Sequence, residues 1–199
     1  MNYEIVLASN NAHKLKEVRE ILCPHGIIVY SLNDVNLHPK EVEENAPDYY
    51  GNALIKAKSV QELTSFPIIA DDSGIEIEAL DNKPGIRSAR FATEHGGHAL
   101  AIEYILKNIN DNRKARFICD ICLLNVDEKP LRFEGIVEGE IAYEPYGEGG
   151  FGYDPIFICK ETGKTYAEMK QEEKNKFSHR GKALRKLITY LLINGKIKH

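Results

Sequence analysis

Two short polar segments carry the residue types best suited to phosphate and metal chemistry. The first, Ser9–Lys14, has the sequence Ser-Asn-Asn-Ala-His-Lys and lies between an apolar run and an amphipathic stretch. A helix that begins here would present backbone N–H groups and the positive end of its dipole, and Lys14 would add a full charge. The segment could therefore bind an anion such as phosphate. Taken alone, it is better explained as a capped helix followed by a surface lysine.

The second segment places two aspartates side by side. Asp71 and Asp72 follow the apolar run Pro67–Ala70 and precede Ser-Gly, so we expect them where a strand meets a loop. Adjacent carboxylates are costly there unless they are paired or metal-bound. Mg²⁺ takes carboxylate oxygens and leaves positions for phosphate oxygens and water, and Glu41, Glu43 and Glu44 in the preceding loop could add ligands. The alternative is an ordinary Asp-Ser-Gly turn.

Two further groups of polar residues are predicted to lie on helices. Asn52 and Lys56 are four residues apart, so they share a polar face that could meet a phosphate–metal centre or simply solvent. Ser178 could cap the last helix, which would leave His179 and Arg180 in its first turn as hydrogen-bond donors. Lys174 lies just upstream, in what could be no more than a charged run. Together, these groups describe a magnesium-dependent nucleotide site.

Strand and helix patterns alternate along the chain and predict one α/β unit with a mixed sheet. The expected strands are Ile5–Ala8, Ile27–Tyr30, Pro67–Ala70, Ile75–Ala79, 115–125, 131–143 and one entered from the loop at Phe151–Cys159. Strands 115–125 and 131–143 are expected to be antiparallel neighbours. The expected helices are Ala12–Leu22, a helix capped by Asp48 and running to about Leu63, 98–109, and one from Ser178 to Gly195.

Composition places the chain among ordinary globular proteins. It has 199 residues, 43% of them apolar and 28% charged, and a net charge of −4. No apolar run approaches the roughly 18 to 20 residues of a membrane span, and the first residues lack a basic leader, so we expect a cytoplasmic protein with no membrane partner. Residues 160–186 are basic on an otherwise acidic chain. This segment is short for a nucleic-acid surface, so we expect no nucleic-acid partner.

Three familiar patterns fail on their context. Residues 147–152 match G-x-G-x-x-G, but a strand-like segment follows where a dinucleotide site needs a helix. Gly163-Lys164-Thr165 resembles the end of a phosphate-binding loop, yet Ile158 stands where the earlier glycine is required. Cys119 and Cys122 form C-x-x-C on a predicted strand, where residues three apart point to opposite faces. We therefore expect packing cysteines and neither a redox pair nor a zinc site.

Six blocks in order along the chain resemble the inosine/xanthosine triphosphate pyrophosphatase family, the XTP/dITP diphosphatases, from about Ile5 to Leu192. The blocks are Ser9–Lys14, Asn52–Ala57, Ala70–Gly74, Pro84–Phe91, Gly150–Pro155 and Ser178–Arg180. The resemblance implies a single catalytic domain over residues 1–199. It also implies an elongated two-lobed α/β fold with a long central mixed β-sheet flanked by helices and a substrate cleft between the lobes. The implied enzyme is a Mg²⁺-dependent homodimer that hydrolyses ITP, dITP and XTP to the monophosphate and pyrophosphate, removing deaminated purines from the nucleotide pool.

The resemblance also implies roles for individual residues. Glu44 and Asp72 would hold the metal, and Asp72 would be the catalytic proton acceptor. Gly51 stands where many relatives have an acidic residue, so no metal role is expected there. Ser9 replaces a more frequent threonine, and the choice between Glu43 and Glu44 stays open. The implied substrate contacts are Ser9, Asn10, Asn11, Ala12, His13, Lys14, Lys56, Ser73, Phe151, Gly152, Tyr153, Asp154, Lys174, His179 and Arg180.

The expected reaction is in-line attack by a metal-activated water at the α-phosphorus. Lys14, Lys56 and Lys174 would stabilise the growing charge on phosphate oxygens. Arg180 and His179 would donate to the 6-oxo group of the purine, and Phe151 would stack on the base. Two alternatives stay open: a pyrophosphatase for pyrimidine or modified nucleotides, and a non-catalytic nucleotide sensor.

Overall fold

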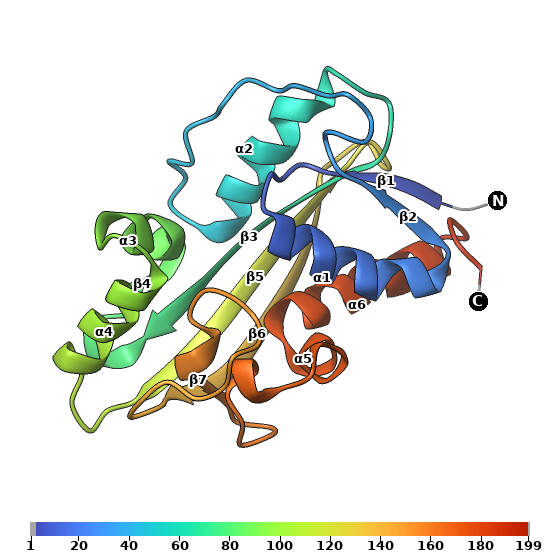
Figure 1. The fold of residues 1–199 in the computed structure, drawn as a ribbon. Helices are drawn as coiled ribbons and strands as arrows, with labels where there is room; N and C mark the ends of the chain where they lie inside the picture. The colour runs from blue at the N-terminus through green and yellow to red at the C-terminus, as the bar shows by residue number, and fades with distance from the viewer. Residues whose placement is uncertain (1–2, 199) are drawn as a thin grey trace. The chain divides into compact units, whose positions relative to one another are not determined.

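The computed structural model of the protein describes residues 3–198 and contains a seven-stranded sheet (Figure 1). Its order is β2-β1-β3-β5-β6-β7, with β4 paired to β3. Strand β1 runs parallel to β2 and β3, whereas β3–β4 and β6–β7 are antiparallel, so the sheet is mixed as predicted. The strands are β1 Tyr3–Leu7, β2 Ile27–Tyr30, β3 Ile68–Ile77, β4 Lys83–Pro84, β5 Lys114–Leu124, β6 Leu131–Ile141 and β7 Phe157–Cys159.

Six α-helices accompany the sheet in the described residues, which confirms the α/β fold class. Helix α1 has the predicted bounds, and Asp48 caps α2 through a hydrogen bond from the Gly51 amide to its Oδ1, at 2.7 Å. Ser178 accepts from the Gly181 amide at 3.0 Å, as a cap of α6 does. The helices are α1 Ala12–Leu22, α2 Tyr49–Gln61, α3 Ser88–Glu94, α4 His98–Asn108, α5 Gln171–Phe177 and α6 His179–Ile193.

The chain divides into two compact units. Unit 1 comprises the residues up to Asp72, Cys119–Gly135 and the residues from Lys182 onward, and unit 2 comprises Ser73–Ile118 and Ile136–Gly181. Strands β3, β5 and β6 contribute residues to both units. The expected single domain over 1–199 and the expected cleft between lobes stay predictions.

Unit 1 is built on the two faces of its part of the sheet. Ile5 and Leu7 of β1 join α1 and α6 in one apolar cluster, whereas Val6 and Ala8 join α2 in another. This alternation is the two-residue period of a strand. Cys119 lies in the first cluster and Cys122 in the second, and both are free thiols, which confirms that they are packing residues on opposite faces.

Unit 2 has its own apolar cluster. Ile75 and Ile77 of β3, Phe117 of β5 and Val137 of β6 pack with α3, α4 and the aromatic residues of the segments around β7. Most of these side chains are fully buried. Unit 2 therefore has an apolar core of its own.

The prediction for Asp71 and Asp72 was wrong in its local structure. In place of two strands with a turn between them, β3 runs without interruption from Ile68 to Ile77 and carries both aspartates in its interior. Gly74 permits this path, because a Cβ there would lie 2.1 Å from the Gly85 carbonyl oxygen. The glycine thus marks a close approach of two backbones and not the end of a strand.

Two helices were not predicted, α3 and α5. The segment 171–177, which was read as a charged run, forms α5 and buries Lys174. Strands β5 and β6 are neighbours, as expected. In the part of the chain that the structure describes, no helix is long and apolar enough to cross a membrane.

Candidate active site

Asp71 and Asp72 are consecutive residues of β3 and contact different helices. The Asp71 Oδ1 atom lies 3.2 Å from the Lys14 ammonium of α1, and its Oδ2 accepts from the Cys119 thiol at 3.8 Å. The Asp72 Oδ1 atom lies 3.4 Å from the Lys56 ammonium of α2. Both carboxylates are buried. Because side chains alternate along a strand, the pair meets one lysine on each face of the sheet.

Lys56 lies between the two predicted metal ligands. Its ammonium is 3.0 Å from Glu44 Oε2 and 3.4 Å from Asp72 Oδ1. Burial alone would lower the pKa of Lys56, but the carboxylates of Asp72, Asp71 and Glu44 outweigh that effect and raise it. The lysine therefore stays charged and links the loop that carries Glu44 to β3. This contact favours Glu44 over Glu43 as the second candidate metal ligand, because the side chain of Glu43 is exposed.

The pKa of Asp72 is raised above its ordinary value. Burial is the largest cause, the charges of Lys56 and Lys14 oppose it, and Glu44 and Asp71 add to it. Asn52 donates from its amide nitrogen to Asp72 Oδ2 at 3.3 Å and is fully buried. The polar face shared by Asn52 and Lys56 thus meets a carboxylate, so the interpretation as a solvent face is wrong, and its contact with a phosphate–metal centre stays a prediction.

The N-terminus of α1 is capped by its own sequence. Asn11 Oδ1 accepts from the amides of His13 and Lys14 at 3.0 and 3.1 Å, and Ser9 Oγ accepts from the Asn11 amide at 3.1 Å. The capped-helix interpretation of this segment is therefore confirmed. The same interpretation placed Lys14 on the surface, and this part is wrong, because Lys14 is only 14% exposed and pairs with Asp71. Asn10 and Ala12 are exposed.

In unit 2, a buried ion pair organises the predicted Phe151–Asp154 segment. The Lys174 ammonium lies 2.6 Å from Asp154 Oδ2, and both side chains are almost completely buried. The same oxygen accepts from the Phe151 amide at 2.8 Å. The ammonium also lies 4.6 Å from the centre of the Phe151 ring. Lys174 is therefore not a surface cation in a charged run, but the internal counter-ion of Asp154.

Arg180 and His179 are also seated in unit 2. Arg180 is 1% exposed, donates from Nη2 to Ser73 Oγ at 3.0 Å, and places its guanidinium carbon 5.9 Å from the centre of the Phe151 ring. The His179 ring stacks on Phe117 at 4.5 Å with an angle of 8° between the ring planes. Phe117 was not identified from the sequence, where it is one apolar residue of a strand.

Gly152 and Tyr153 lie in the same segment. The Tyr153 hydroxyl donates to the Ser88 carbonyl at 2.6 Å, and burial raises its pKa. This side chain is therefore held by a protein acceptor. Gly152 adopts a left-handed backbone, with φ at 66°, and is partly exposed. The two units thus hold two clusters: Ser9–Lys14, Glu44, Lys56 and Asp72 in unit 1, and Ser73, Phe151–Asp154, Lys174, His179 and Arg180 in unit 2.

The donors in unit 1 have the chemistry of a magnesium site. Among residues 3–198, no three His, Cys, Asp or Glu side chains are grouped as a metal cage. Mg²⁺ commonly uses one or two carboxylates, with water and substrate phosphates completing its shell, so such a cage is not needed. Glu44 and Asp72 supply carboxylate oxygens on either side of one ammonium. The residues present therefore fit a magnesium ion.

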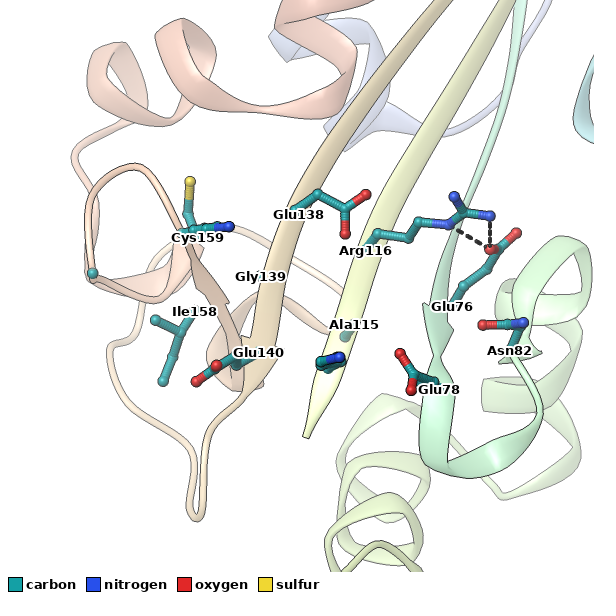
Figure 2. A pocket seen from close by; sticks show the side chains of 13 residues that line it. Glu76, Glu78, Asn82, Ala115, Arg116, Glu138, Gly139, Glu140, Ile158 and Cys159 are labelled. Carbon is teal, nitrogen blue, oxygen red and sulfur yellow. Dashed lines mark hydrogen bonds and ion pairs between the residues drawn. The ribbon is translucent and has the colours of Figure 1, made fainter. Parts of the chain in front are cut away.

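A groove of about 920 Å³ lies elsewhere in unit 2 and contains none of the predicted site residues (Figure 2). Glu76 of β3 and Glu138 and Glu140 of β6 alternate with less exposed neighbours, Glu78 follows the end of β3, and Arg116 pairs with Glu76 at 2.8 Å. Alternation of this kind is typical of a solvated sheet face. Lys114, Arg116 and Lys160 also line the groove, and none of its described carboxylates belongs to a group that could hold a metal ion.

The chain is similar over most of its length to one protein family and to solved structures of its members. The model of the Ham1 family matches residues 5–190. A Bacillus subtilis (strain 168) protein named dITP/XTP pyrophosphatase is 44% identical over 192 residues, which cover 94% of this chain and 96% of that protein. The solved structure of a HAM1 protein from Coxiella burnetii has a TM-score of 0.83 and 40% identity, and covers 95% of this chain and 98% of its own. The crystal structure of a nucleoside-triphosphatase, dITP/XTP pyrophosphatase, from Mycobacterium abscessus has a TM-score of 0.72 and 38% identity, with 92% and 98% covered. The resemblance predicted from the six sequence blocks is confirmed.

The contacts of Lys56 predict a pH-dependent loss of stability. In Lys56→Met, Asp72 and Glu44 lose their shared counter-ion, and we expect unfolding free energy to fall by about 1–3 kcal/mol near neutral pH. The pKa of Asp72 already lies above its unfolded value, and losing the lysine raises it further. As the pH falls, a carboxyl with a raised folded-state pKa is protonated in the folded protein before it is protonated in the unfolded chain. The loss of unfolding free energy in Lys56→Met therefore shrinks as the pH falls through the folded-state pKa of Asp72.

Urea denaturation at about pH 7.5 and about pH 4.5 measures this difference, with Lys58→Met as the control because Lys58 is exposed on the same helix. An equal loss for Lys56→Met at both pH values would show that the ionic contacts do not set the effect.

Proposed function

The chain belongs to the Ham1 family, and we propose that it hydrolyses dITP, XTP and ITP to the nucleoside monophosphate and pyrophosphate. The observation that carries the proposal is the pair of partly buried lysines, Lys14 and Lys56, held by consecutive buried carboxylates of β3. Relatives of similar length carry the name dITP/XTP pyrophosphatase. These two supports are independent, because one rests on contacts within this chain and the other on likeness to other chains.

We propose that the unit 1 cluster binds the triphosphate. Lys14 and Lys56 are fixed by their carboxylate partners, so their charges are in place before substrate arrives and need little reorganisation. Lys14 follows the capped turn Ser9–Asn11 at the start of α1, where the dipole also favours an anion. A phosphate oxygen would share the ammonium of each lysine with the carboxylate that holds it.

We propose that Glu44 and Asp72 hold Mg²⁺. The ionic contacts here join Glu44, Asp71 and Asp72 with two lysines, which leaves one negative charge in excess. A divalent cation would compensate that excess and the charge of the substrate. When bound, Mg²⁺ supplies Lewis-acid polarisation of phosphate oxygens and a lowered pKa for bound water. Asp72, a buried carboxylate of the same cluster, would also be the acceptor for the proton of the attacking water.

We propose that unit 2 reads the purine base. The guanidinium of Arg180 and the ring of His179 can donate to a 6-oxo group, whereas the 6-amino group of adenine would meet them donor to donor. Phe151 offers an aromatic face, and Asp154 fixes its backbone amide. Lys174, neutralised by Asp154, is better suited to holding this segment than to binding phosphate. The homodimer and the cytoplasmic location expected from the sequence remain predictions.

Release of pyrophosphate from ITP, XTP, dITP, GTP, ATP and a pyrimidine triphosphate, with and without Mg²⁺, tests the proposal. We expect release from the first three at rates at least about 10-fold above the others, and only with the metal. Asp72→Asn should lower turnover by about 10³-fold or more, because it removes a metal ligand and a proton acceptor together. Binding of ITP without release would instead identify a nucleotide sensor, and preference for pyrimidines would identify a different pyrophosphatase.

Arg180→Ala tests the reading of the base. Loss of the guanidinium should reduce the preference for ITP over ATP in kcat/KM by about 10-fold or more, since a hydrogen bond to a charged group contributes about 1.5–3 kcal/mol. Arg185→Ala, at an exposed position of the same helix, is the control. An unchanged preference in a folded Arg180→Ala protein would exclude this arginine from base recognition.

A further inference from the structure

Asn52 makes two hydrogen bonds that join separate parts of unit 1. Its Oδ1 accepts from the backbone amide of Ala46 at 2.9 Å, and its Nδ2 donates to Asp72 Oδ2 at 3.3 Å. The side chain is fully buried in α2. One partner belongs to the loop that precedes α2, and the other to β3. An amide is the side-chain group that can accept on one side and donate on the other in this way.

The loop that Asn52 holds is packed closely against the start of α2. A Cβ at position 51 would lie 2.5 Å from the Cβ of Ala46 and 3.1 Å from Asp48 Oδ1, so only glycine fits there without a shift. Asp48 caps the helix through the Gly51 amide. Hydrogen bonds at Ala46 and at Asp48 therefore hold the loop against α2. This packing gives a physical reason for glycine at position 51.

Glu44 lies two residues before Ala46, whose backbone amide donates to Asn52. Its carboxylate contacts Lys56, one helical turn beyond Asn52 on the same face of α2. Asp72 contacts both of these α2 side chains. Glu44 and Asp72 are thus connected twice, once through the Lys56 ammonium and once through the Asn52 amide.

We propose that Asn52 is a positioning residue for the reaction: it sets the distance between Glu44 and Asp72 before metal or nucleotide binds. The inference rests on the proposed function for its catalytic consequence, and on the two hydrogen bonds for its structural one. The Lys56 link is ionic and would be shared with a phosphate when substrate binds. The hydrogen bonds of Asn52 come from an uncharged, buried amide, so they persist when substrate binds and keep Glu44 and Asp72 at a fixed separation. Loss of such a supporting contact commonly lowers metal affinity or activity by about 10- to 100-fold.

Two substitutions separate the two bonds of Asn52. Asn52→Ala removes both, whereas Asn52→Asp keeps an acceptor for the Ala46 amide and replaces the donor to Asp72 with a carboxylate that repels it. The matched control is Asn125→Asp, because Asn125 also lies in unit 1 and its Nδ2 donates to the carbonyls of Thr64 and Phe66, at 3.3 and 3.0 Å. That control loses amide donors of the same kind at a place with no contact to Glu44 or Asp72.

Hydrogen exchange of the Ala46 amide, measured on the protein without metal or nucleotide, reads the structural link. Asn52→Ala should speed this exchange by about 10-fold or more, while Asn52→Asp and Asn125→Asp should leave it within about 2-fold. Unchanged exchange in Asn52→Ala would overturn the inference. This outcome does not depend on what the protein hydrolyses.

Steady-state kinetics with dITP read the catalytic consequence. Both Asn52 variants should lose about 10- to 100-fold in kcat and need more Mg²⁺ for half-maximal rate, with KM for dITP changed by less than about 3-fold. Asn125→Asp should keep kcat even where urea unfolding shows the same loss of stability. Wild-type kcat in Asn52→Asp, or an equal loss of kcat in Asn125→Asp, would reject the positioning role. A wild-type protein that releases no pyrophosphate from any triphosphate would instead reject the proposed function and leave the Ala46 result standing.

Discussion

The two-residue alternation of β3 is the constraint on which the unit 1 site depends. Consecutive side chains of a strand point to opposite faces, so Asp71 and Asp72 must find separate partners. Each meets a lysine from the helix that covers its face, Lys14 from α1 and Lys56 from α2. A buried carboxylate without a counter-ion would be strongly destabilising, and the same holds for a buried ammonium. Folding therefore brings two positive charges to the middle of one strand.

The two clusters differ in how their charges are balanced. In unit 2, Lys174 and Asp154 are a closed pair, and Arg180 is held by the Ser73 hydroxyl and lies near an aromatic ring. In unit 1, carboxylates outnumber the lysines they contact. A preorganised cluster with a closed ion pair and a held guanidinium donor would suit recognition of an uncharged base, and a cluster with excess carboxylates would suit a cation and a polyphosphate.

Local patterns predicted much of the structure, and long-range contacts account for what they missed. The bounds of α1, the Asp48 cap and the opposed cysteines follow from periodicity and capping, which are properties of neighbouring residues. The continuity of β3 depends on Gly85 lying against Gly74, and the burial of Lys174 depends on Asp154, twenty residues earlier. The residue types of the candidate site were identified from the sequence, but their pairing was not. Asn52 was noticed for its spacing from Lys56, yet its bond to Ala46 has no signature in the sequence.

A crystal structure of the wild-type protein with Mg²⁺ and a dITP analogue that carries an imido bridge between the α- and β-phosphorus atoms tests the central claim most directly. We expect phosphate oxygens within hydrogen-bond distance of both Lys14 Nζ and Lys56 Nζ, with the carboxylates of Glu44 and Asp72 on the metal. A triphosphate bound instead along the groove at Lys114, Arg116 and Lys160, with Lys14 and Lys56 still occupied only by their carboxylates, would contradict it.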